Sequence, residues 1–176
     1  LVESGYERVT MAGIASRAGS SKETLYNWFG SKEGLFSALI TANADESAAR
    51  VRDALEGEAD PRDTLVAFAT GLLALLTSPG SVALNRAALT SRDLATVLLA
   101  NGRHRVGPLV ETYLGRLAER GEIVIDDPGS AFQLLYGLAI KDIQIRVLLG
   151  EPAPPIADLA VHASQAVDRF LTLTRP

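Results

Sequence analysis

Apolar residues recur at three- and four-residue intervals along most of the chain, which is the spacing of amphipathic α-helices. Near the amino terminus this pattern is divided into short segments. Thr10 precedes a run that predicts a helix near 11–18, Gly19 ends it, and a second short helix is predicted near 21–28. Ser31 is then expected to cap a third, much longer helix. Two short helices joined by a tight turn predict a helix-turn-helix.

The second short helix carries two kinds of side chain. Leu25, Trp28 and Phe29 are expected to pack inward, and Ser20 and Glu23 have the spacing of a capping box that would begin the helix. The outer face is expected to hold polar and aromatic residues, namely Lys22, Glu23, Thr24, Tyr26 and Asn27. Such a mixed set suits a helix that reads the major groove of DNA.

From Asp60 onward the pattern is helical, and no segment is convincing as a strand. We expect one helix to start at Asp60-Pro61 and to end at Ser78-Pro79-Gly80. Residues 81–100 predict one or two helices with a break near Ser91, and another helix is predicted to run to about Arg120. The sequence therefore predicts an all-α protein.

The last two predicted helices carry more apolar surface than one small domain can cover. The helix over about 128–149 is apolar almost all round, and the helix over about 156–173 repeats apolar residues at three-and-four spacing. We expect these helices to pair with those of a second copy in a four-helix interface. The resulting homodimer would place two recognition helices on successive major-groove faces.

Composition narrows the class of protein further. Hydrophobic residues make up 47% of the 176 residues, which argues against disorder, and the absence of Cys excludes disulfide frameworks and thiolate catalysis. The chain start does not resemble a signal peptide, and the longest apolar run, 131–149, is interrupted by Lys141, Asp142 and Arg146. We therefore expect a cytoplasmic protein without a membrane partner. His104 and His162 do not suggest a metal site, and no cofactor is expected.

Charge argues mildly against a nucleic-acid partner, because the net charge is −4. The helix-turn-helix segment itself is near neutral or slightly positive. From residue 5 to residue 41 its charged side chains are Arg8, Arg17, Lys22 and Lys32 against Glu7, Glu23 and Glu33. Affinity for DNA would then depend on a dimer that presents two such helix-turn-helix segments.

Residues 5–36 resemble the DNA-binding domain of the tetracycline-repressor-like (TetR/AcrR) family of bacterial regulators. The matching residues are Gly5-Tyr6, Val9-Thr10, Ile14-Ala15, Ala18-Gly19, Ser21-Lys22, Thr24-Leu25-Tyr26, Phe29, Ser31-Lys32-Glu33 and Leu35-Phe36. The resemblance implies a first helix before Gly5, most of which is missing from this sequence. It also implies a three-helix DNA-binding domain over 1–42 and a helical effector-binding and dimerisation domain over 43–176.

The carboxy-terminal half is similar to AefR-type members of the same group. Its matching residues are Leu75-Leu76-Thr77-Ser78-Pro79, Arg86, Gly121, Asp126-Asp127-Pro128, Ala131 and Arg146-Val147-Leu148-Leu149-Gly150. Together the two resemblances imply a homodimeric repressor that binds a palindromic operator on double-stranded DNA. A small apolar effector would release it from the DNA.

The resemblance also implies which residues contact DNA, namely Thr10, Ser21, Lys22, Thr24, Tyr26, Asn27 and Lys32. Tyr26 and Lys32 would bind phosphates, and Lys22 and Thr24 would reach base edges. The alternative is that Thr10 and Ser21 are only helix caps and that Lys32 is a solvated lysine. The candidates for an effector pocket are polar or aromatic residues among apolar helix faces. They are Asn85, Arg86, His104, Tyr113, Gln133, Tyr136, Lys141 and Gln144. Tyr113 and Tyr136 are also readable as ordinary core aromatics.

Two other functions compete with this interpretation. Asp158, His162 and Ser164 are close in sequence, but residues two apart on a helix point in different directions, so we expect no catalysis. The acidic balance would also suit a helical dimer whose head no longer binds DNA and acts as a protein-interaction module.

Overall fold

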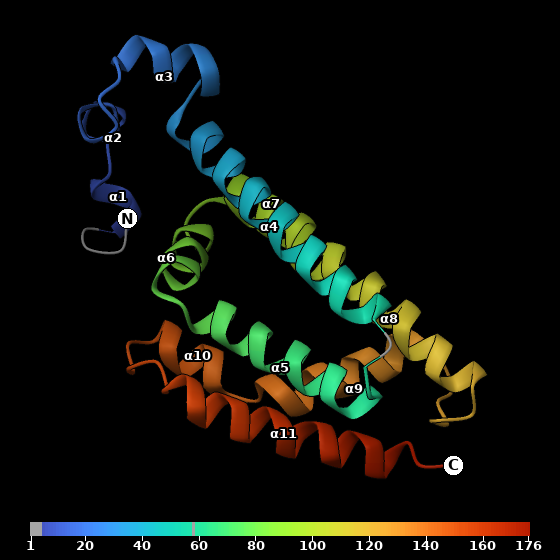
Figure 1. The fold of residues 1–176 in the computed structure, drawn as a ribbon. Helices are drawn as coiled ribbons and strands as arrows, with labels where there is room; N and C mark the ends of the chain where they lie inside the picture. Colours follow the sequence, from blue (N-terminus) through green and yellow to red (C-terminus); the bar gives the residue numbers. More distant parts are fainter. Residues whose placement is uncertain (1–4, 58) are drawn as a thin grey trace.

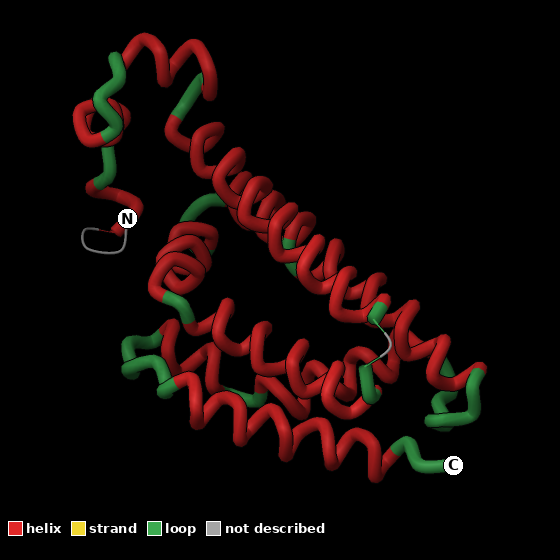
Figure 2. The backbone as a smooth tube through the Cα atoms, in the orientation of Figure 1, coloured by secondary structure: helices red, strands yellow, loops and turns green. Residues whose placement is uncertain are grey.

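The computed structural model describes residues 5–57 and 59–176, and the regular structure within these residues is entirely helical (Figures 1 and 2). The helices are α1 (Gly5–Arg8), α2 (Met11–Arg17), α3 (Lys22–Phe29), α4 (Lys32–Glu56), α5 (Pro61–Thr77), α6 (Pro79–Ala88), α7 (Arg92–Asn101), α8 (Arg103–Glu119), α9 (Pro128–Ile140), α10 (Ile143–Leu148) and α11 (Ile156–Leu173). The all-α prediction is confirmed. The first helix predicted before Gly5 lies outside the described residues.

Most helix starts follow from the capping side chains that the sequence offers. Thr10 Oγ1 accepts a hydrogen bond from the Gly13 N–H at 3.1 Å, and Ser31 Oγ accepts one from the Gly34 N–H at 3.1 Å. The capping box at Ser20 is wrong. The Ser20 N–H closes α2 by donating to Ala15 O at 2.9 Å, so the cap of α3 falls on the next residue, Ser21.

The helix predicted over 128–149 is also wrong, because the chain turns between α9 and α10. Lys141 has a φ of 44°, a left-handed conformation that ends α9. A carbonyl near that end, Ala139 O, lies 2.8 Å from Nε2 of His162 on α11, and since a carbonyl only accepts, the imidazole donates. The apolar pattern continues through the break because α10 packs against α5 and α6. The hydrophobic periodicity here indicated that the segment packs against other helices, but it did not indicate that the helix is interrupted.

Two hydrophobic clusters hold together the described helices from α4 onward. The larger one joins α5, α8, α9 and α11 around fully buried side chains such as Leu65, Leu114 and Phe170. A smaller one, which includes Phe36 and Leu94, packs the beginning of α4 against α6 and α7. Helix α4 runs unbroken through the domain boundary predicted at residues 42 and 43, so that division stays a prediction.

No single helix within the described residues has the length and hydropathy of a membrane span. Helices α5 and α6 together reach that length and composition, but they are bent by 63° with respect to each other.

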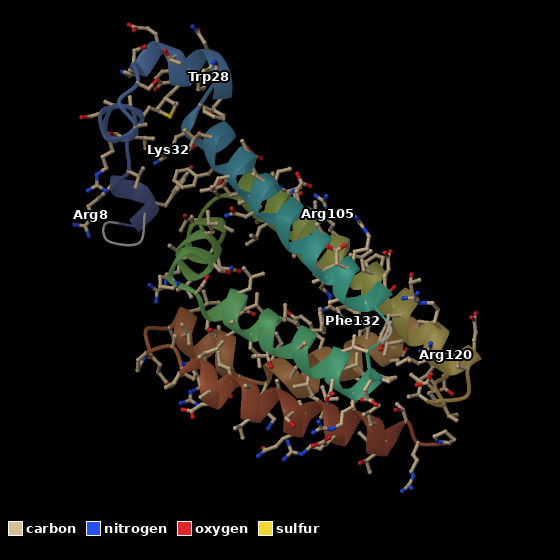
Figure 3. The ribbon with its side chains drawn as sticks, in the orientation of Figure 1. Arg8, Trp28, Lys32, Arg105, Arg120 and Phe132 are labelled. Carbon is tan, nitrogen blue, oxygen red and sulfur yellow. The ribbon has the colours of Figure 1, made fainter. Side chains whose placement is uncertain are left out.

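Helix α4 connects the amino-terminal helices to the bundle and is fastened to α8 by two polar contacts. Arg105 on α8, labelled in Figure 3, forms an ion pair with Asp45 on α4. Farther along, Arg116 Nη2 donates to Leu55 O in the last turn of α4 at 2.8 Å. These contacts join α8 directly to the helix that continues from α3.

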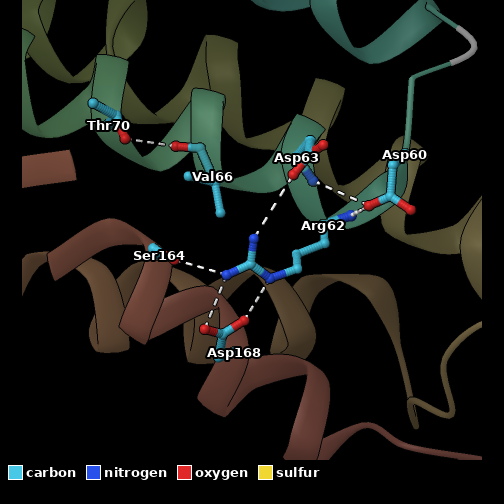
Figure 4. A network of polar contacts seen from close by, with 7 residues as sticks. All are labelled: Asp60, Arg62, Asp63, Val66, Thr70, Ser164 and Asp168. Carbon is cyan, nitrogen blue, oxygen red and sulfur yellow. Dashed lines mark hydrogen bonds and ion pairs between the residues drawn. The ribbon is translucent and has the colours of Figure 1, made fainter. Parts of the chain in front are cut away.

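A second polar network joins the start of α5 to α11 (Figure 4). Arg62 donates from Nε to Asp168 Oδ1 at 2.6 Å and from Nη2 to Asp168 Oδ2 at 3.0 Å. The same Nη2 donates to Ser164 Oγ at 2.7 Å. The forked geometry makes this a specific contact between two helices that are distant in sequence. The hydrogen bonds from Arg62 hold the pKa of Asp168 below its usual value of 3.8.

The Arg62–Asp168 pair predicts an acid-sensitive part of the stability. Since the pKa of Asp168 is lower in the folded than in the unfolded chain, the contribution is present above pH 3.8 and is lost as the pH falls through the folded pKa. We expect Asp168→Asn to lower the Tm near neutral pH and to have little effect at strongly acidic pH. Thermal unfolding of both proteins across this range measures the difference, with Asp158→Asn on the same helix as the control. A Tm difference that does not change with pH would contradict the assignment.

Candidate nucleic-acid interface

Helix α3 is held on one side and exposed on the other. Leu25 is buried against Met11 and Ala15 of α2 in a small hydrophobic cluster, which fixes the orientation of α3. The opposite side presents exposed residues of several chemical types, namely Lys22, Glu23, Tyr26, Asn27 and Trp28. An exposed helix held by a rigid companion is the arrangement that can enter a major groove.

On this surface, Trp28 differs most from its predicted position. It was predicted to pack inward, but 72% of its surface is exposed, and its side chain lies at the end of α3 (Figure 3). Leu25 and Phe29, four residues apart, occupy the packed face, and Trp28 falls to its edge. Trp28 contacts Phe29 with ring centroids 6.3 Å apart. Its indole N–H and ring are available for contact with a ligand, which makes it a candidate that the sequence interpretation missed.

The residues predicted to contact DNA from α3 include two neighbouring pairs. The Lys22 ammonium is 5.6 Å from the centroid of the Tyr26 ring. Thr24 is half-buried, and its Oγ1 lies 2.9 Å from Ser21 Oγ, which also accepts from the Thr24 N–H. Ser21 is therefore a helix cap, and so is Thr10 at the start of α2. The caps leave both hydroxyl groups exposed at the ends of the two short helices.

Lys32 lies away from this group, beside α1 (Figure 3). Its Nζ donates to Tyr6 O at 3.1 Å and is 4.0 Å from the centroid of the Tyr6 ring. The hydroxyl of Tyr6 donates to Glu33 Oε1 at 3.0 Å, and the ring packs edge-on against Phe36. The Glu33 backbone N–H, followed by the Tyr6 hydroxyl, lowers the pKa of the Glu33 carboxyl. One of the three donors of Lys32 is thus used within the protein, and the ammonium is fixed in position.

The residues predicted to line an effector pocket do not surround one cavity. A cavity of about 470 Å³ at the ends of α4 and α5 is lined by Tyr113 with Arg116 and Arg120, and by none of the other predicted residues. Arg86 donates to the carbonyls of Val147 and Leu148 at the end of α10. The side chains of His104, Gln133 and Lys141 are exposed, and that of Gln144 is half-buried.

Two further pocket candidates have partners within the helices. Asn85 Nδ2 donates to Ser81 O one turn earlier at 2.9 Å, so its amide is engaged within α6. Tyr136 lies on α9 next to Phe132, with ring centroids 5.8 Å apart, and Arg103 of α8 lies over its ring. Tyr136 therefore stands at the contact between two helices.

The residues considered for catalysis do not contact one another. His162 bonds to the Ala139 carbonyl, whereas Ser164 accepts from Arg62. Asp158 is exposed in the first turn of α11. The described geometry gives no Ser-His-Asp arrangement.

Models of two protein families match the chain. Residues 1–39 match the family described as bacterial regulatory proteins, tetR family. Residues 63–173 match the AefR-like transcriptional repressor, C-terminal domain. The first match covers the helix-turn-helix, and the second covers most of the chain from α5 to α11.

Solved structures of regulators are similar over nearly the whole chain. A TetR transcriptional regulator from Agrobacterium tumefaciens is 37% identical with a TM-score of 0.77, and the match covers 99% of this chain and 88% of that one. The flavonoid-responsive regulator FrrA is 27% identical with a TM-score of 0.74, over 99% of this chain and 91% of that one.

A curated relative matches over a shorter stretch. The HTH-type transcriptional activator FasR of Mycolicibacterium smegmatis is 41% identical over 64 residues, which are 36% of this chain and 29% of FasR. With both family models matched and the Agrobacterium regulator similar along its length, the chain belongs to the TetR family of transcriptional regulators and has an AefR-like carboxy-terminal domain.

Proposed function

We propose that this protein is a homodimeric, effector-responsive repressor that binds a palindromic operator through helix α3 of each subunit. The observation that carries the proposal is the exposed surface of α3, held rigidly by the buried Leu25. Lys22 and Thr24 read base edges, and Tyr26, Lys32 and the indole N–H of Trp28 bind phosphates. Thr10, Ser21 and Asn27 complete the contacts with DNA.

The exposed faces of α9 and α11 support a dimer. These two helices pack side by side, and apolar groups remain on their outer surfaces. Leu134 on α9 is 39% exposed, Val161 on α11 is 59% exposed, and Gly137 leaves open space where a Cβ would project. A second copy of the same two helices would cover this surface with an identical one, which is the arrangement of a two-fold interface.

The response to an effector acts through α4. Helix α4 is fastened to α8 by the Arg105–Asp45 ion pair and the Arg116–Leu55 hydrogen bond. A ligand that shifts α8 therefore changes the position of the helix-turn-helix formed by α2 and α3. The effector favours a spacing of the two α3 helices that no longer fits successive grooves, and the DNA is released. The relative FrrA is described as flavonoid-responsive, which supports a small-molecule effector.

The chain contains a single tryptophan, so its intrinsic tryptophan fluorescence reports on α3 alone. We expect the Trp28 emission to change when operator-containing duplex is added, because the exposed indole loses contact with water at the DNA surface. The change should disappear at high salt, since the phosphate contacts are electrostatic. Fluorescence titration checks this, and the anisotropy of a labelled duplex measures binding in parallel.

Two results of that titration would contradict the proposal, each in a different way. Binding that leaves Trp28 emission unchanged would place the DNA on another surface and contradict the role of α3. A protein that fails to bind any duplex from the DNA around its own gene would contradict the proposed function as a whole.

A further inference from the structure

We propose that Arg103 forms a binding site for the acidic group of a small organic anion with an apolar body. The site lies at the first turn of α8, where this helix meets α9. The inference that this ligand acts as the effector rests on the function proposed above, but the binding site itself does not.

The Arg103 guanidinium lies over two aromatic rings of α9. Its Cζ is 4.8 Å from the centroid of Tyr136 and 5.5 Å from that of Phe132. Contact with ring faces holds a guanidinium in place without using its N–H donors. Arg103 has no carboxylate partner among the residues that the structure describes, and its side chain is exposed. Its forked donors are thus positioned for a carboxylate from outside the protein.

The surroundings of Arg103 suit an apolar body attached to that carboxylate. Tyr136 is half-buried beside the ring of Phe132, and Val106 and Leu109 on α8 are partly buried against the main core. At Gly107, a Cβ would lie 3.1 Å from Phe132 Cε1, so the absence of a side chain lets the two helices approach closely there. The site therefore combines one fixed cation with the half-buried ring of Tyr136 and the aliphatic groups of α8, and this favours an anion that carries an apolar body.

Arg103 is also placed to influence the position of the helix-turn-helix formed by α2 and α3. It is two residues before Arg105, and because residues two apart are rotated by about 200° on a helix, the two side chains face different neighbours. Arg103 contacts α9, and Arg105 is paired with Asp45 on α4. An anion that pulls on Arg103 therefore acts on the same helical turn that fastens α4.

Calorimetry with matched probes tests the site in the absence of DNA. The probes are decanoate and hydrocinnamate, each compared with its neutral alcohol. We expect the wild-type protein to bind at least one carboxylate more tightly than its alcohol. Arg103→Met keeps the contact with the rings but removes the charge, so its affinity for that carboxylate should fall by about 10- to 100-fold with little change for the alcohol. Arg52→Met, another exposed arginine, should change neither affinity.

The outcomes separate this inference from the proposed function. If Arg103→Met binds the carboxylates as the wild type does, or if the wild type binds neither carboxylate, the site is refuted. Arg103→Lys, which retains the charge, should recover part of the affinity. Adding the bound carboxylate to a complex with DNA then tests the effector role. A protein that binds the anion through Arg103 but never binds DNA refutes the proposed function and leaves the site standing.

Discussion

Replacing Val161 with aspartate is expected to convert the dimer into monomers and to lower affinity for a palindromic operator by about 10²- to 10⁴-fold. Val161 is 59% exposed on α11, and in the proposed dimer it is covered by the partner. An aspartate there would be buried without a cation to pair with, which is strongly unfavourable. A monomer keeps one recognition helix, so it loses the gain from binding two half-sites at once.

Light scattering coupled to size-exclusion chromatography measures the mass, and a gel shift measures operator affinity. Leu99→Asp is the matched control, because Leu99 is 52% exposed but lies on α7. It should leave both the mass and the affinity unchanged. A Val161→Asp protein that remains dimeric would show that α11 does not form the interface.

Lys32→Ala and Tyr26→Phe are expected to weaken DNA binding in two distinguishable ways. Loss of the Lys32 ammonium removes one phosphate contact from each subunit, so the slope of log K against log salt should become shallower by about 2 in the dimer. Tyr26→Phe removes a hydroxyl but no charge, so the affinity should fall while the slope stays the same. Since phosphates carry no sequence information, both losses should be similar for all duplexes.

Lys32→Arg is the control for the salt slope, because it keeps the positive charge. Lys32 also bonds to Tyr6, so the Tm of each variant shows whether α1 remains attached to α4. An unchanged slope for a correctly folded Lys32→Ala protein would remove Lys32 from the phosphate contacts.

The sequence predicted those parts of the structure that depend on local chemistry. Thr10, Ser31 and Asp60 cap the helices that they were expected to begin, because a short polar side chain before an apolar run has few other roles. The inward position of Leu25 and the helices α5 and α11 also follow from periodicity. Each of these features depends on residues that are close together in the sequence, so the sequence alone was enough to predict it.

The parts that were missed depend on contacts between distant segments. Trp28 is exposed because Leu25 and Phe29 already fill the space against α2, which its hydrophobicity does not reveal. The turn at Lys141 is accompanied by a bond from His162, a residue on another helix. Arg86 was predicted in a pocket, yet it binds the last carbonyls of α10, which its place on an apolar helix face could not indicate.

Selection of bound duplexes from a random pool measures directly which DNA sequences the two α3 helices of a dimer recognise. We expect enrichment of an inverted repeat whose half-sites lie on successive turns of the major groove, about 34 Å apart or a multiple of that distance. Substitution of Lys22 should relax the preference at one symmetric pair of positions in that repeat. Enrichment of a single, unrepeated site, or no enrichment from a pool that the dimer has sampled, would contradict operator recognition by two α3 helices.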